Sequence, residues 1–214
     1  MEENKKMIKK LVSFACCLLP IGAGAVTVNP EGADAFVSTE GTAWQNAISS
    51  GQTITVSAGN SILSENGFTI TNNMYLGMDA QGSGSGDLYI LNTVQNPFTI
   101  VSQGDVSVGA MLQVLEGKTL AFKSSDTGPV AFDLTVGNGG IKVGNASATA
   151  NLTMQNIDAL NVGGVIQSYG NFTVSANSVN VGNLDVNAGN TAINTLTGAV
   201  AVDGITVDGD GTTN

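Results

Sequence analysis

The sequence NLTMQNIDALNVGGVIQSYGNFTVSANSVNV, residues 151–181, contains nearly the same pattern twice. Residues 151–154 (NLTM) return as residues 171–174 (NFTV), and residues 160–163 (LNVG) return as residues 179–182 (VNVG). In each copy apolar residues alternate with Thr or Asn, which is the period of a strand with one buried face. An advance of about twenty residues per copy indicates a repeat whose units stack on one another.

Short alternating segments of this kind fill the chain from residue 53 to residue 214, and most are followed by Gly, Asn, Asp or Ser. Examples are residues 53–56 (TITV), 68–70 (FTI) and 120–122 (LAF). Three strands of this length with their turns take up roughly 22–24 residues, which falls within the repeat lengths of stacked architectures. We therefore predict an all-β fold, a single-stranded parallel β-helix (β-solenoid), over residues 53–214.

The alternative all-β fold is a β-sandwich of antiparallel strands. Such a fold needs tight hairpin turns, for which Asn-Gly and Asp-Gly are well suited. Pairs of this kind occur at Asn66-Gly67, Asn138-Gly139, Asp203-Gly204 and Asp208-Gly209. A sandwich gives no reason for a repeat of twenty residues, so the repeat favours the parallel stack. In such a stack, Asn at repeated positions can bond its neighbour in the next unit.

Residues 26–52 are expected to form an N-terminal region that precedes the stack. Residues 26–28 (VTV) suit a strand, and an acidic loop follows. A short helix with an N-cap, one apolar face and a terminal glycine is then indicated by Thr42, Trp44, Ala47, Ile48 and Gly51. Because so short a helix is marginal alone, we expect it to cap the first unit of the stack, whose strand edges and core would otherwise face water.

Residues 43–78 resemble the opening of right-handed parallel β-helices of the pectate-lyase-like superfamily. The resemblance rests on the order of the elements: a short helix that ends at Gly51, a β-branched strand at residues 53–56, an Ala-Gly turn at residues 58–59, and further strands. It implies the same fold for the stack. It also implies that the helix is an N-terminal cap.

The first 25 residues have the organisation of a secretory signal peptide. Lysines within residues 5–10 are followed by an apolar run at residues 11–21, and Ala23-Gly24-Ala25 supplies small residues for cleavage after Ala25. The run is shorter than the ~20 residues that span a membrane and contains Pro20. We expect a secreted protein, extracellular or associated with the outer-membrane surface, and no membrane insertion by the mature chain.

Removal of residues 1–25 would leave three lysines, fifteen acidic residues and no cysteine, a net charge of −12. A surface of this charge repels phosphate backbones, so we predict no nucleic-acid partner. Anionic membrane surfaces are disfavoured for the same reason. Without disulfides, the fold must depend on packing and backbone hydrogen bonds.

The expected mature chain also lacks His and Arg, which removes imidazole bases, thiol nucleophiles and histidine-bound metals. Glycosidase chemistry needs only two carboxylates ~5–9.5 Å apart, and stacking could bring together Asp126 with Asp133 or Asp185 with Asp203. Nothing in the sequence distinguishes these residues from acids in solvated turns. We predict a protein that is not an enzyme and has no catalytic or cofactor-binding residues. A polysaccharide-active lyase or glycoside hydrolase is the alternative.

Asp203, Asp208 and Asp210 are each followed by glycine, a rhythm that resembles calcium-binding loops. Oxygen ligands at alternate positions suit calcium. The full spacing of such a loop and its terminal Glu are missing, however. An acidic turn accounts for the pattern, so we predict no metal site and no cofactor.

The signal peptide, the acidic composition rich in Asn, Gly and Thr, and the stacked strands together resemble the passenger region of a bacterial autotransporter or a similar surface adhesin. This resemblance covers residues 1–214 in composition and rhythm. It implies an adhesin or stalk whose polar acidic face binds a host or matrix glycan or protein, or a structural protein that associates with itself end to end. Residues 208–214 lack the alternation of an outer-membrane barrel strand, so we expect either a stack truncated at its C-terminus or a freely secreted product.

Overall fold

The computed structural model describes residues 26–28, 37–38, 54–58, 62–64, 66–77, 87–92, 98–115, 117–124, 131–195, 198–207 and 212–213. These residues form strands joined by turns and bends, with no helix among them. The predicted all-β class is confirmed for this part of the chain. The predicted signal peptide at residues 1–25 and the predicted capping helix at residues 42–51 lie outside the described residues.

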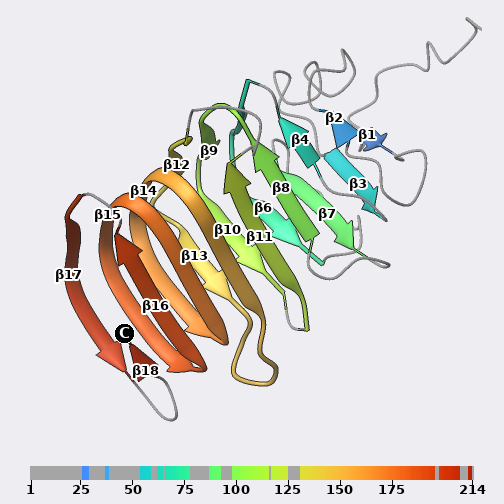
Figure 1. Ribbon diagram of the computed structural model, residues 1–214. Coiled ribbons are helices and arrows are strands. Elements are labelled where there is room, and N and C mark those ends of the chain that lie inside the picture. Colours follow the sequence, from blue (N-terminus) through green and yellow to red (C-terminus); the bar gives the residue numbers. More distant parts are fainter. Residues whose placement is uncertain are drawn as a thin grey trace, which may run out of the picture.

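The strand pairings between the described strands are all parallel, and the sheet they form curves around a common core (Figure 1). The antiparallel sandwich is therefore wrong for this part of the chain. The Asn138-Gly139 pair makes no hairpin, because it joins strands on different parts of the sheet. Of these, β12 (Leu134–Val136) pairs with β9 and β14, and β13 (Gly140–Val143) pairs with β10 and β14.

The parallel pairings fall into three series, which we call faces 1, 2 and 3. Face 1 contains β1 (Val26–Val28), β3 (Ile54–Ala58), β7 (Leu88–Asn92), β6 (Met74–Leu76), β10 (Met111–Val114) and β13. Face 2 contains β2 (Val37–Ser38), β4 (Ile62–Ser64), β8 (Phe98–Ser102), β11 (Thr119–Ser124), β16 (Asn190–Thr195) and β18 (Thr212–Thr213). Face 3 contains β5 (Phe68–Ile70), β9 (Val106–Val108) and β12.

Three long strands extend over more than one face. They are β14 (Asn151–Tyr169), β15 (Asn171–Ala188) and β17 (Val200–Val207). The sequence predicted separate short strands here, but the pairing continues through the bends because β-bulges shift the register without ending the strand. Asn156 lies at one bend with a φ of 55°, a left-handed conformation that Asn tolerates well.

One passage of the chain through faces 2, 3 and 1 is called a layer. From Asn151 to Asn171 the step between layers is 20 residues, as predicted. From Leu120 to Leu152 the step is 32 residues, and from Met74 to Leu112 it is 38. The additional residues lie between strands, so they lengthen the connections without changing which side chains face the core. The predicted constant step is therefore confirmed only for the last layers.

Strand β7 departs from the order of the chain. It pairs with both β3 and β6 and so lies between them, although β4, β5 and β6 precede it in sequence. The ring of Tyr89 in β7 stacks on that of Tyr75 in β6, with centroids 5.0 Å apart. The buried Asp87 accepts hydrogen bonds from the backbone N of Asn73 (2.9 Å), its Nδ2 (3.1 Å) and the Tyr89 hydroxyl (3.0 Å). These bonds satisfy a carboxylate that the sequence placed in a protruding loop.

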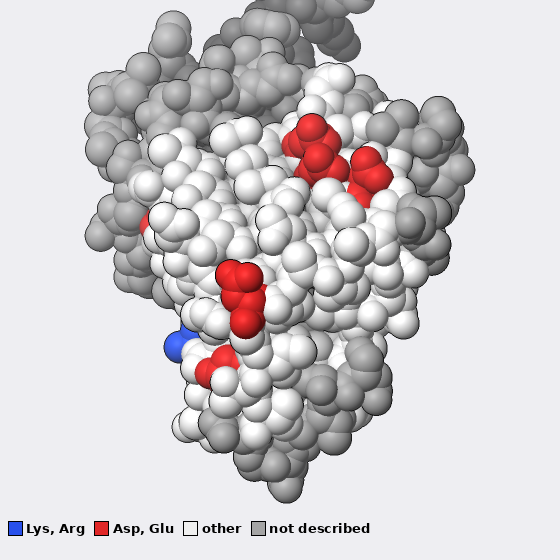
Figure 2. Space-filling model, turned by 90° about the vertical axis from the view of Figure 1, so that its left-hand side faces the viewer, with Lys and Arg blue, Asp and Glu red and all other residues white. Residues whose placement is uncertain are grey.

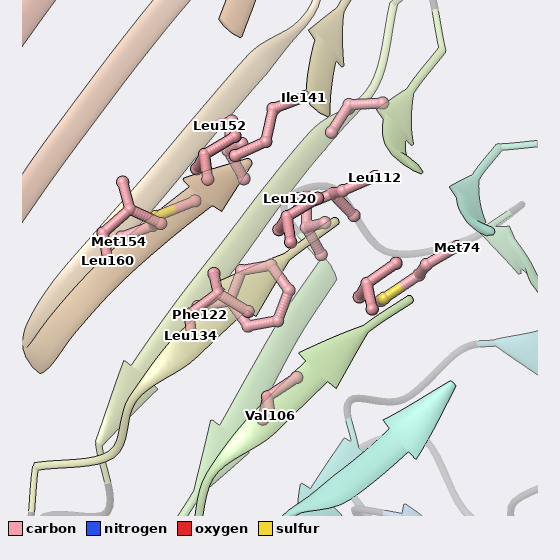
Figure 3. Close-up of a cluster of buried hydrophobic side chains, with 14 of the residues drawn as sticks. Met74, Val106, Leu112, Leu120, Phe122, Leu134, Ile141, Leu152, Met154 and Leu160 are labelled. Atoms are coloured by element: carbon pink, nitrogen blue, oxygen red, sulfur yellow. The ribbon is translucent and has the colours of Figure 1, made fainter. Parts of the chain in front are cut away.

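Inward-pointing side chains form apolar rows that cross the layers (Figure 3). Leu152, Met154, Phe172 and Val174, which alternation predicted to point inward, have no exposed surface. Leu152 is paired in register with Leu120 on one side and Phe172 on the other. Each full burial of such a side chain stabilises the fold by roughly 1.5–3 kcal/mol, and the core is the sum of many equivalent contacts.

We expect Leu152→Ala to lower the free energy of unfolding by about 2–5 kcal/mol, because it opens a cavity between two neighbouring layers. Its matched control is Thr153→Ala, which changes the adjacent half-buried position that points outward. Chemical denaturation of both variants measures the difference. Equal losses of stability would contradict the assignment of Leu152 to the core.

Candidate functional site

Polar side chains that point away from the core form a continuous row along face 1. Parallel register aligns Tyr75, Gln113, Lys142, Gln167 and Asp185 from one layer to the next. Neighbouring strands lie about 4.8 Å apart, so the row presents one side chain at that interval. All five residues are half-buried, and Gln167 Nε2 donates a hydrogen bond of 3.4 Å to Asp185 Oδ2. We call this set the outer row.

A shallow hollow of about 420 Å³ lies at the end of face 1, beside the outer row. Tyr169 follows Gln167 by two residues and Asn187 follows Asp185 by two residues, so alternation places all four on the outer side of the sheet. The remaining wall is formed by residues 145–149 and Ala188. The hollow thus combines one aromatic ring with amide and hydroxyl groups.

The wall formed by residues 145–149 is held in shape by a local turn. Asn145 Oδ1 accepts hydrogen bonds from the backbone N of Ser147 (2.8 Å) and of Ala148 (3.0 Å). An asparagine that bonds its own backbone two residues ahead is a common turn device. Ser147 and Thr149 are exposed, so their hydroxyl groups are accessible at the rim of the hollow.

Two polar atoms next to the hollow have no hydrogen-bond partner among the described residues. They are Asp185 Oδ1 and Asn187 Nδ2, both buried although their residues are half-buried. A buried polar atom without a partner costs about 1–3 kcal/mol. The two atoms combine an unused acceptor and an unused donor on one strand. A small rotation of the side chains toward the hollow would offer both to a group that donates and accepts, such as a hydroxyl.

Acidic side chains gather elsewhere, at the bend between faces 2 and 3. Asp105 Oδ1 accepts a hydrogen bond from the backbone N of Asp133 (2.9 Å), and Asp133 Oδ1 accepts one from the backbone N of Ala159 (3.1 Å). Asp158 Oδ1 accepts one from Asn177 Nδ2 (2.8 Å). Each of these carboxylates bonds a group of the next layer, so the three residues stabilise the bend.

Burial raises the pKa of Asp133 above its ordinary value, and the negative charges of Asp105 and Asp158 raise it further. The hydrogen bond from the Ala159 N–H acts in the opposite direction. A raised carboxyl pKa can mark a catalytic acid. Asp133 does not line the hollow, however, and its oxygen is engaged by the backbone, so its environment is that of a structural residue.

Asparagines at the start of face 2 form a second series of contacts between layers. Asn151 Oδ1 accepts a hydrogen bond from the backbone N of Asn171 (3.1 Å), and Asn171 Oδ1 accepts one from the backbone N of Asn190 (3.1 Å). The predicted contact between repeated asparagines is confirmed in position. The donor is the backbone N–H rather than a side-chain amide, because the oxygen takes the place of a carbonyl where each strand begins.

The carboxylate pairs considered from the sequence are not supported by the structure. Asp126, the expected partner of Asp133, lies outside the described residues. Asp185 is in register with Thr206, whereas Asp203 lies at the bend between faces 3 and 1, so the sheet does not align these two acids. The sequence analysis did not identify Asp105 and Asp158 as neighbours of Asp133. A signal existed, since Asp105 and Asp133 each directly precede an alternating apolar segment.

The acidic turn considered for calcium is described only in part. Asp203 lies in β17, and Asp208 and Asp210 lie outside the described residues. Within the described ranges, no group of three or more Asp, Glu, His or Cys side chains is placed to hold a metal ion.

Charge is sparse on the side of the molecule that carries β17. Figure 2 shows this side largely uncharged, with acidic side chains in separate spots and a lysine only near one margin. Acidic groups on this side therefore do not merge into one continuous patch.

No family model, no curated protein and no solved structure matches this chain. In the part of the chain that the structure describes, no helix has the length and apolar character needed to cross a membrane. The chemistry of the outer row and the hollow must therefore be judged from their own geometry.

The raised pKa of Asp133 predicts a pH dependence of stability. Its protonated form is favoured in the folded chain, and this contribution is complete below the ordinary pKa of 3.8 and is lost as the pH rises through the raised value. Asp133→Asn keeps the acceptor for Ala159 and removes the charge. We expect its stability relative to the unmodified protein to increase from acid to neutral pH.

Chemical denaturation over this pH range measures the change. Asp203→Asn is the matched control, because it removes one carboxylate away from Asp105 and Asp158. If the relative stability of the Asp133→Asn variant decreases toward neutral pH, the carboxyl groups do not repel one another in the folded state.

Proposed function

We propose that this protein is a β-solenoid exported from the cell, where it serves as an adhesin-like passenger or structural stalk at the cell surface. The parallel β-helix interpretation is supported by three series of parallel pairings, by layers that follow one another along the chain and by apolar rows that cross them. Export is supported by residues 1–25, with their lysines, apolar run and small residues before the expected cleavage point.

The ligand surface of this proposal is the outer row together with the hollow, and the ligand is a glycan. The observation that carries it is the hollow, where the ring of Tyr169 lies near the unused acceptor of Asp185 and the unused donor of Asn187. Sugar hydroxyls both donate and accept hydrogen bonds, and an aromatic ring offers an apolar surface to the C–H groups of a sugar. One hydroxyl or two adjacent hydroxyls would satisfy both atoms.

An extended ligand suits the outer row better than a globular partner does. The row has amide, ammonium and carboxylate groups and no aliphatic member, whereas protein interfaces usually have an apolar core. Side chains repeated at about 4.8 Å along the direction of stacking can bind a chain that lies across several layers. The hollow would then fix one end of that chain.

A binding role is favoured over cleavage of a polysaccharide. Hydrolysis of a glycosidic bond requires two carboxylates directed at the bond. In the described structure the outer row contributes one, Asp185, and the acidic residues at the other bend accept hydrogen bonds from the backbone of neighbouring layers.

The proposal is tested by probing a glycan array with the purified chain and its variants. We expect Tyr169→Ala to abolish binding, because the ring supplies the apolar wall of the hollow. We expect Asn187→Ala to weaken binding to the same glycans by roughly three- to tenfold, the effect of losing one hydrogen bond.

The matched control is Asn180→Ala, because Asn180 is an exposed asparagine of the same strand on face 3. This variant should bind like the unmodified protein. The proposal is wrong if the unmodified protein binds no glycan, or if all three variants bind equally well.

A further inference from the structure

Strand β17 lies at one end of the described stack and exposes apolar side chains (Figure 1). Val200, Ile205 and Val207 are 47%, 58% and 44% exposed. Parallel register aligns them with Val179, Leu184 and Val186 of β15, each at most 2% exposed. The three side chains therefore occupy core positions of the last layer, which lack a further layer to cover them.

The backbone of β17 is also unpaired on one side. Among the described strands β17 pairs only with β15, and β18 pairs with β16 on face 2. An edge strand with unpaired N–H and C=O groups and apolar side chains readily pairs with another strand. This end of the molecule is also poor in charge, which favours association (Figure 2).

The sequence of β17, VAVDGITV, has a pattern that is symmetric about its midpoint. Val200 and Val207 are equidistant from the point between Asp203 and Gly204, and so are Val202 and Ile205. All four align with buried core residues of β15. Because the bend of the strand lies at this midpoint, the inward positions on face 3 mirror those on face 1.

We propose that β17 pairs with the β17 of a second copy of this chain in antiparallel orientation, about a two-fold axis between Asp203 and Gly204. Val200 then lies opposite Val207 of the other copy, and Val202 lies opposite Ile205. The axis exchanges faces 1 and 3, so the apolar core continues from one copy into the other. This proposal concerns a surface separate from the glycan site.

A two-fold contact of this kind closes on itself, because both copies use the same surface. It defines the end-to-end association that the sequence suggested as a dimer and not a filament. Head-to-tail stacking would instead join the β17 end to the opposite end of the next copy, and it would continue to grow as the concentration rises.

Sedimentation velocity at several protein concentrations tests the proposal. We expect a dimer that does not grow further, and we expect Ile205→Lys and Val200→Lys each to produce monomers that retain the circular dichroism of the unmodified protein. The matched control is Val165→Lys, because Val165 is 43% exposed but lies in β14, away from this end. It should remain a dimer.

A second variant tests the register of the contact. Gly204→Lys places an ammonium opposite Asp203 of the other copy, and symmetry creates the pair twice. The new Cβ meets only the end of the flexible Asn183 side chain, so the fold tolerates it. Two exposed ion pairs should tighten the dimer by roughly two- to thirtyfold, and high salt should remove this gain.

Each other outcome would overturn the proposal. A monomer at every concentration would show that the end does not associate, and oligomers that grow with concentration would show head-to-tail stacking. A dimer that persists in both Ile205→Lys and Val200→Lys would place the interface elsewhere. A dimer of unchanged affinity in Gly204→Lys at low salt would exclude this register.

Discussion

Parallel pairing in register is the constraint on which the rest of the structure depends. Once Asn151 is paired with Asn171, each following position of β14 has its partner in β15 fixed, apart from single-residue shifts at the bulges. Because side chains alternate with a period of two, an inward residue must then lie on an inward residue. The apolar rows of the core and the polar rows of the exterior are two consequences of the same backbone hydrogen bonds.

This constraint also decides where chemistry can occur. On the outer side of the sheet, Lys142, Gln167 and Asp185 become neighbours although they are far apart in the chain. At the bends the same register places Asp105 and Asp133 where their carboxylates bond the next layer. Similar residues are therefore structural at the bends and available on face 1, and position in the layer distinguishes the two.

Much of the fold could be predicted because its signal is local. The alternation at Leu152, Met154, Phe172 and Val174 identified their inward direction, and the repeat of twenty residues predicted the step of the last layers. The longer steps and the position of β7 could not be predicted, because residues between strands leave the alternation unchanged. The candidate site was missed for a related reason, since Tyr169 is an ordinary outward residue until the fold forms a hollow beside it.

The sequence by itself determined that this chain forms β-strands with one apolar side, since the period of two requires only local backbone geometry and the burial of apolar side chains. It also determined the sparse positive charge and the residue types available for chemistry. Only the tertiary structure decided which strands lie side by side, which polar atoms lack partners and which apolar residues remain exposed on β17. These properties depend on contacts between residues distant in the chain, and the lengths of the connections set those contacts.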